Sequence, residues 1–228
     1  MIIILSGLSF FQNDTQLYSA IIGEERDYKS SQGKIYNGMC ANYTFCFLEV
    51  ANNSCFTYTQ VSANLFKVTW VHVGGIASWI ENKQTRSTSN SSGPLGVRNG
   101  SKAFLWLFTN ISLGDLILIA VDGIGNHLFN VTNELCCNYT GIGDIEVWVL
   151  QDMSYPGVAW YEKSTGILIN GTFVWYGTNS YDFSLISTDI FSYYQDQKKG
   201  GEILKYSLII FLPLLISIIA LVMLRKRE

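Results

Sequence analysis

Charged residues are scarce in this chain of 228 residues. They make up 14% of the sequence, whereas a soluble domain usually carries about 25%. Lys and Arg number 15 against 18 Asp and Glu, and this balance offers no basic surface for phosphates, so we do not expect nucleic acid as a partner. Proline occurs three times and aromatic residues make up 14%, which excludes collagen-like and disordered chains, because those lack apolar surface for a core.

Catalytic and cofactor-binding motifs are missing as well. The chain has no G-x-S-x-G, H-E-x-x-H, phosphate-loop or G-x-G-x-x-G pattern, each of which positions a nucleophile, a metal or a phosphate. The only histidines, His72 and His127, stand at no metal-ligand spacing, and His72 is expected at a strand end. The aspartates near turns lack the dense spacing of a calcium loop; they are Asp115, Asp122, Asp144 and Asp152. We therefore predict no catalytic residue, cofactor or metal, and a membrane-tethered enzyme is the least favoured alternative.

One long apolar run is present near the C-terminus. Residues 206–224 (YSLIIFLPLLISIIALVML) contain no charge, and 19 residues at 1.5 Å per residue span roughly the 30 Å hydrocarbon core of a membrane. Pro213 is tolerated in a membrane-spanning helix. The cations Arg225, Lys226 and Arg227 follow directly, and cationic flanks stay in the cytoplasm. The pattern predicts one transmembrane helix, a cytoplasmic tail at 225–228, a juxtamembrane linker at 198–205 and an outward part before it.

The outward part needs an export signal. Residues 1–11 (MIIILSGLSFF) form a short apolar stretch without the basic residues that usually precede it. Three interpretations stay open: a minimal signal peptide, a start that lies further upstream, or a first strand that is retained. The main extracellular β domain is then predicted over residues 12–197.

Acceptor triplets for N-glycosylation are abundant. With 16 Asn, 22 Ser and 14 Thr in 228 residues, chance predicts about 2.5 Asn-x-Ser/Thr triplets. Nine occur, at Asn13, Asn42, Asn52, Asn90, Asn99, Asn110, Asn130, Asn138 and Asn170. The excess and the outward topology together predict a glycosylated surface protein, whose sugars would supply the solubility that its few charges do not.

The five cysteines lie in the outward part, where an oxidising environment lets disulfides persist. Cys46 and Cys55 flank an expected turn and are candidates for a bridge between neighbouring strands, and Cys40 would then meet Cys136 or Cys137. The adjacent pair cannot bridge without strain, because a disulfide needs a wider Cα separation. Structural bridges are preferred to a metal or redox site, and the remaining thiol is a candidate cross-link between two chains.

Short segments of β-forming residues recur between turn residues. They are 43–50, 54–61, 65–73, 103–111, 115–121, 145–150, 157–162, 167–176 and 181–187. In 65–73, Phe66, Val68, Trp70 and His72 share the expected core face. Residues 74–81 are compatible with a short helix, and 81–102 reads as a long exposed loop within one sheet domain. The pattern predicts a mainly β protein with a curved antiparallel sheet or a sandwich.

Residues 143–190 carry a recognisable pattern. The residues Trp160, Tyr161, Glu162, Lys163, Thr165, Gly166, Ile167 and Leu168 are followed by Leu185, Thr188, Asp189 and Ile190. This part resembles the closing segment of uncharacterised archaeal, thermophile-type, single-pass surface membrane proteins, although that family more often has Asp at position 162 and Asn at position 189. The resemblance implies a β-hairpin in a curved, lipoprotein-carrier-like sheet before a C-terminal transmembrane helix. It implies no activity.

The expected function follows from the predicted anchor, sequons and sheet. We expect a single-pass protein of a cell or virion membrane that acts by binding other surface proteins or as a structural envelope component. The alternatives are a carrier or sensor of an apolar ligand, which the aromatic-rich strands favour, and a viral envelope glycoprotein.

Overall fold

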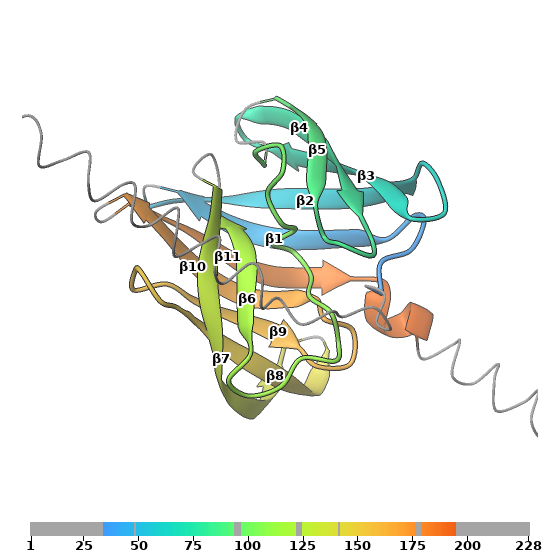
Figure 1. The fold of residues 1–228 in the computed structure, drawn as a ribbon. Helices are drawn as coiled ribbons and strands as arrows, with labels where there is room; N and C mark the ends of the chain where they lie inside the picture. Colours follow the sequence, from blue (N-terminus) through green and yellow to red (C-terminus); the bar gives the residue numbers. More distant parts are fainter. Residues whose placement is uncertain are drawn as a thin grey trace, which may run out of the picture. The chain divides into compact units, whose positions relative to one another are not determined.

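The structure is a computed structural model that describes residues 34–47, 49–93, 97–121, 125–140, 142–176 and 179–194. Within this part, the strands form one antiparallel sheet of eleven strands (Figure 1). In chain order they are β1 Cys40–Phe47, β2 Val50–Gln60, β3 Leu65–His72, β4 Gly75–Asn82, β5 Thr88–Ser92, β6 Leu116–Val121, β7 Gly125–Tyr139, β8 Gly143–Asp152, β9 Val158–Glu162, β10 Leu168–Tyr176 and β11 Asn179–Thr188. The prediction of a mainly β, antiparallel fold is confirmed, and the sheet is one continuous open ladder rather than two packed sheets.

The strand order divides the chain into two meanders. The order across the sheet is β5-β4-β3-β2-β1-β11-β10-β9-β8-β7-β6. The first meander runs outward from β1 to β5, and the second begins at the opposite edge with β6 and returns to β11 beside β1. The connection from β5 to β6 must therefore pass from one edge of the sheet to the other, and in Figure 1 it runs as the green segment across the intervening strands.

The predicted core face of β3 is confirmed. Its residues alternate between buried and solvent-facing positions, and Phe66, Val68, Trp70 and His72 are the buried set. Side chains on successive strand residues point to opposite faces, so one face of the sheet collects the apolar and aromatic residues. We call this buried side the inner face.

Two expectations for the first meander are wrong. Residues 74–81 do not form a helix: β4 covers most of this range, with Ala77, Trp79 and Glu81 on the inner face. The range 81–102, expected as one loop, includes β5. Burial along β4 alternates with a period of two, as in a strand that is buried on one side.

Two further differences concern the middle of the chain. Residues 103–111 contain no strand of the sheet, although they were expected to form one. The longest strand, β7, was not predicted at all. The positions from Thr132 to Cys136 are exposed on both faces, so this half of β7 shows no apolar alternation in the sequence.

The chain divides into two compact units, Met1–Ser187 and Thr188–Glu228. The sheet belongs to the first unit, and the second has one short helical segment at 190–194 among its described residues. The predicted signal or first strand at 1–11 and the predicted transmembrane helix at 206–224 lie outside the described residues. In the part that the structure does describe, no helix is long and apolar enough to span a membrane.

Candidate functional site

The inner face of the sheet is occupied by the chain itself. Residues 101–108, here called the central segment, belong to the connection between β5 and β6, and all but Lys102 are buried. The ring of Phe104 lies 5.3 Å from that of Phe183 and 6.1 Å from those of Phe56 and Phe173, measured between centroids. These rings come from β11, β2 and β10. The central segment therefore fills the aromatic centre of the inner face.

Two turns of the same geometry hold the central segment. We call residues 82–88 the first clasp and residues 162–168 the second clasp. In the first, Asn82 Oδ1 accepts the backbone N–H groups of Gln84 and Thr85 at 2.8 and 3.1 Å. The N–H of Arg86 then donates to the carbonyl oxygen of Asn82 at 2.7 Å, and Arg86 has a φ of 58°.

The second clasp repeats each of these contacts. The Glu162 carboxylate accepts the backbone N–H groups of Ser164 and Thr165 at 2.8 and 2.7 Å. The N–H of Gly166 donates to the carbonyl oxygen of Glu162 at 2.7 Å, and Gly166 has a φ of 77°. The Tyr-Glu-Lys-x-Thr-Gly motif is thus a turn in which Glu162 caps backbone groups, and the positive φ favours glycine.

Both clasps bind the central segment through equivalent backbone atoms. The carbonyl oxygens of Arg86 and Gly166 accept the N–H groups of Ala103 and Leu107, at 2.6 and 2.8 Å. Two residues further along the first clasp, the N–H of Thr88 donates to the carbonyl oxygen of Ser101 at 2.8 Å. In the second clasp, the N–H of Leu168 donates to the carbonyl oxygen of Leu105 at the same distance. The two sets of hydrogen bonds are four residues apart on the central segment, so its backbone is bonded to both halves of the sheet.

Arg86 adds a buried guanidinium to the first clasp. It is 2% exposed, and its Nε and Nη1 atoms donate to the carbonyl oxygens of Trp106 and Leu118 at 3.2 and 3.1 Å. A third bond goes to the carbonyl oxygen of Ala103. Since Leu118 belongs to the edge strand β6, Arg86 connects the first meander to the opposite edge of the sheet.

Glu81 is the buried acid of this cluster. Its Oε1 and Oε2 atoms accept the indole N–H groups of Trp79 and Trp106 at 2.8 and 2.6 Å. Burial raises the pKa of Glu81 from 4.5 to about 6, although both indoles and the charge of Arg86 act to lower it. From β9, in the second meander, the hydroxyl of Tyr161 donates to the carbonyl oxygen of Phe104 at 2.6 Å. Charged and polar groups on β4, β9 and the first clasp therefore fix the central segment in place.

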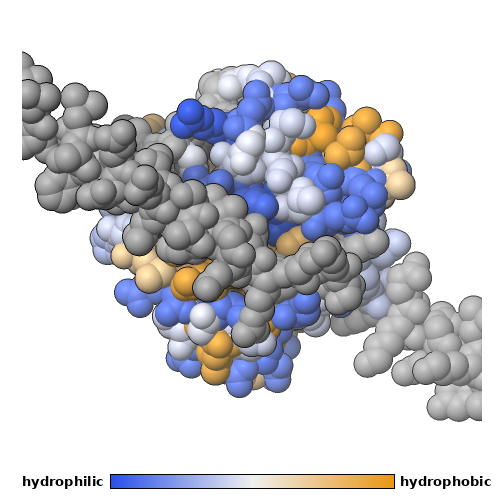
Figure 2. Space-filling view, in the orientation of Figure 1, coloured by the Kyte–Doolittle hydropathy of each residue, from blue (hydrophilic) through white to orange (hydrophobic). Residues whose placement is uncertain are grey.

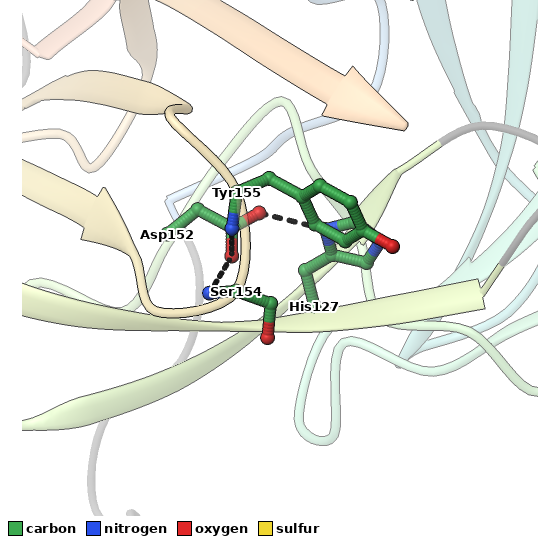
Figure 3. A network of polar contacts seen from close by, with 4 residues as sticks. All are labelled: His127, Asp152, Ser154 and Tyr155. Carbon is green, nitrogen blue, oxygen red and sulfur yellow. Dashed lines mark hydrogen bonds and ion pairs between the residues drawn. The ribbon is translucent and has the colours of Figure 1, made fainter. Parts of the chain in front are cut away.

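His127 and Asp152 form the second buried polar pair. His127 Nδ1 lies 2.6 Å from Asp152 Oδ2, and the two residues are 5% and 4% exposed. Asp152 Oδ1 accepts the backbone N–H groups of Ser154 and Tyr155. The ring of Tyr155 stacks on the imidazole with 5.0 Å between centroids (Figure 3).

A histidine oriented by a carboxylate is one component of a nucleophilic triad. In Figure 3 the side chain of Ser154 points away from the imidazole, and Ser154 meets the pair through its backbone N–H group alone. The arrangement that the structure describes therefore fastens the turn after β8 onto β7 and positions no nucleophile at His127.

The other residues considered as ligands are dispersed. His72 Nδ1 accepts the N–H of Gly74 at 3.1 Å, Asp115 accepts the N–H of Ser112, and Asp144 accepts from Asn138. Asp122 lies outside the described residues. Among the described residues, no group of three or more His, Cys, Asp or Glu side chains is placed to hold a metal ion.

The cysteines form no disulfide, which corrects the expected pairing. Strand register places Cys46 opposite Ala51, whereas Cys55 stands opposite Asn42 at the far end of the same hairpin. Cys136 and Cys137 lie on β7, which is five strands away from β1. The two sulfurs that come together are those of Cys40 and Cys55, at 3.5 Å, and no pair is at bonding distance.

The sequon asparagines that the structure describes are exposed or half-buried. The exposed ones are Asn90, Asn99, Asn110, Asn138 and Asn170. Asn42, Asn52 and Asn130 are half-buried, and Asn13 lies outside the described residues. Hydrophobic residues on the face in view form small groups among hydrophilic ones (Figure 2). The described surface thus offers sites at which an attached sugar would meet solvent.

Comparison with known proteins adds no relative. No family model matches this chain, and no curated protein matches it. The resemblance to archaeal surface proteins therefore stays a prediction.

The residues that organise the interior were not singled out in the sequence. Glu81 and Arg86 stand in a stretch that was expected to be a helix end and an exposed loop. A signal for them exists, because residues 82–85 (Asn-Lys-Gln-Thr) and 162–165 (Glu-Lys-Ser-Thr) share a side-chain acceptor, a lysine and a threonine at the same spacing.

Proposed function

We propose that this chain is a membrane-anchored, N-glycosylated surface protein that acts by binding other surface proteins or as a structural component of an envelope. The observation that carries the proposal is the filled inner face. With Phe104 at the centre of the inner aromatic rings and both clasps on the backbone, the outer surface remains to meet partners. That surface also bears the exposed sequon asparagines.

The anchoring rests on the sequence. Residues 206–224 have the length and composition of a membrane span, and Arg225, Lys226 and Arg227 follow it as a cytoplasmic flank would. The same pattern suits a cellular or a viral membrane. Other envelope or surface proteins are the expected partners.

A carrier or sensor of an apolar ligand is the second candidate, because aromatic rings line the inner face. The central segment weakens it. Leu105, Trp106 and Leu107 are each 1% exposed, so a ligand on the inner face would have to displace a buried segment whose backbone is hydrogen-bonded to both clasps. Binding on the outer surface needs no such rearrangement.

The proposal is tested by topology. The full-length chain with an epitope tag after Glu228 is produced in intact cells, and protease is added outside. We expect the protease to digest the outward domain and to leave a short fragment that carries the tag, because the membrane protects it. A chain that keeps its full length on intact cells, but is cut after detergent lysis, would contradict the proposal.

A further inference from the structure

Cys40 and Cys55 meet on the outer side of the β1–β2 hairpin. Their neighbours Ala41 and Phe56 are buried on the inner face, so both thiols lie on the opposite, half-buried side. Register pairs Cys55 with Asn42 and Cys40 with Thr57, which makes the two cysteines diagonal neighbours. Diagonal side chains on adjacent strands are within reach of each other, and here the sulfurs lie 3.5 Å apart.

The register also separates Cys55 from the partner that the sequence suggested. Cys46 is opposite Ala51, four residue pairs along the hairpin from Cys55, which corresponds to about 13 Å at about 3.3 Å per residue. A disulfide requires Cα atoms within about 7 Å. Cys46 and Cys55 therefore cannot bridge without a shift of strand register, whereas Cys40 and Cys55 need to close only the remaining gap between their sulfurs.

We propose that Cys40 and Cys55 are the pair that forms a disulfide when the domain meets a disulfide-bearing oxidant, as it would if it faces outward as proposed above. One cysteine thiolate attacks a sulfur of the oxidant and releases the first oxidant thiol. The second cysteine thiolate then attacks the mixed disulfide and releases the second. Two protein thiols are oxidised to one disulfide, one oxidant disulfide is reduced to two thiols, and the two protons end on the released thiols.

The test uses the purified full-length chain and oxidised glutathione. After blocking of the remaining thiols, a non-reducing digest is analysed by mass spectrometry. We expect a linked peptide pair that contains Cys40 and Cys55. The variant Cys46→Ser is the matched control and keeps this link, whereas Cys40→Ser and Cys55→Ser both lose it while their circular dichroism remains that of the wild type.

A Cys46–Cys55 or Cys40–Cys46 link would overturn the pairing, and so would complete alkylation of Cys40 and Cys55 after oxidation. Because this experiment uses purified protein, its failure does not depend on the topology. A bridge that forms in vitro but is absent from protein isolated from its native cells would instead contradict the outward placement.

Discussion

Glu81 and Arg86 are ionisable side chains in an apolar interior. Taking such groups out of water is unfavourable unless hydrogen bonds compensate, and removal of one partner leaves the others unsatisfied. Glu81 accepts two indole N–H groups and Arg86 donates to three carbonyl oxygens. These bonds select one position for the central segment, so we expect stability to depend on them more than on any surface ion pair.

Replacement of the guanidinium tests this dependence. Arg86→Lys keeps the charge but loses the planar fork that reaches Trp106, Leu118 and Ala103 together. We expect the free energy of unfolding to fall by about 2–4 kcal/mol, as measured by urea denaturation. Arg98→Lys, at an exposed position, is the control and should change little. Equal stability of both variants would contradict the role of Arg86.

The pKa of Glu81 gives a pH dependence with a definite sign. Burial raises this pKa from 4.5 to about 6 in the folded state, so the protonated form is favoured by folding. The contribution of Glu81 protonation to the free energy of unfolding is about 2 kcal/mol. It is fully present below pH 4.5 and is lost as the pH rises through 6. Glu81→Gln has no such titration.

Urea denaturation of the wild type and of Glu81→Gln at pH 4 and pH 7.5 measures this contribution. Between pH 4 and pH 7.5, the free energy of unfolding of Glu81→Gln should rise by about 2 kcal/mol relative to that of the wild type. Parallel pH profiles would show that Glu81 titrates normally in the folded protein.

At the scale of elements, the two clasps are equivalent turns on opposite halves of the sheet. Their backbone bonds and positive φ angles correspond position by position. Gly166 lies so close to Leu107 that an added Cβ would clash with the Leu107 carbonyl oxygen. Glycine therefore allows the second clasp to approach Leu107 this closely, whereas the equivalent position of the first clasp is occupied by Arg86.

Gly166→Ala is therefore expected to be destabilising by about 2–4 kcal/mol, from the left-handed backbone and the clash together. Gly114→Ala is the matched control, since Gly114 also has a positive φ of 84° but no atom within 4 Å of the added Cβ. It should lower the free energy of unfolding by about 1–2 kcal/mol. Thermal denaturation of both variants compares them directly, and the account fails at this point if Gly114→Ala is the less stable.

The strands that could be predicted are those with one buried face. In β3 the alternation is regular, so the predicted range 65–73 is close to the observed strand. The central segment was mistaken for a strand because residues buried on every side read as a continuous apolar run, whatever their backbone conformation. The outer half of β7 is exposed on both faces and gave no periodic signal.

At the scale of the whole molecule, the path of the chain could not be predicted. A connection that links the two edges of an open sheet is set by long-range pairing, and no local pattern specifies it. The contact between Cys40 and Cys55 depends on strand register in the same way, as does the meeting of His127 with Asp152. The sequons and the terminal apolar run are local patterns, and they carry the proposed function for that reason.

Glycopeptide mapping of the chain purified from its native membranes tests the central claim most directly. We expect N-linked sugar on the exposed sequon asparagines Asn90, Asn99, Asn110, Asn138 and Asn170. Asn133 is equally exposed but heads no triplet, so it should carry none. Unmodified asparagine at all five sequons, in protein recovered from the membrane, would contradict a glycosylated surface protein.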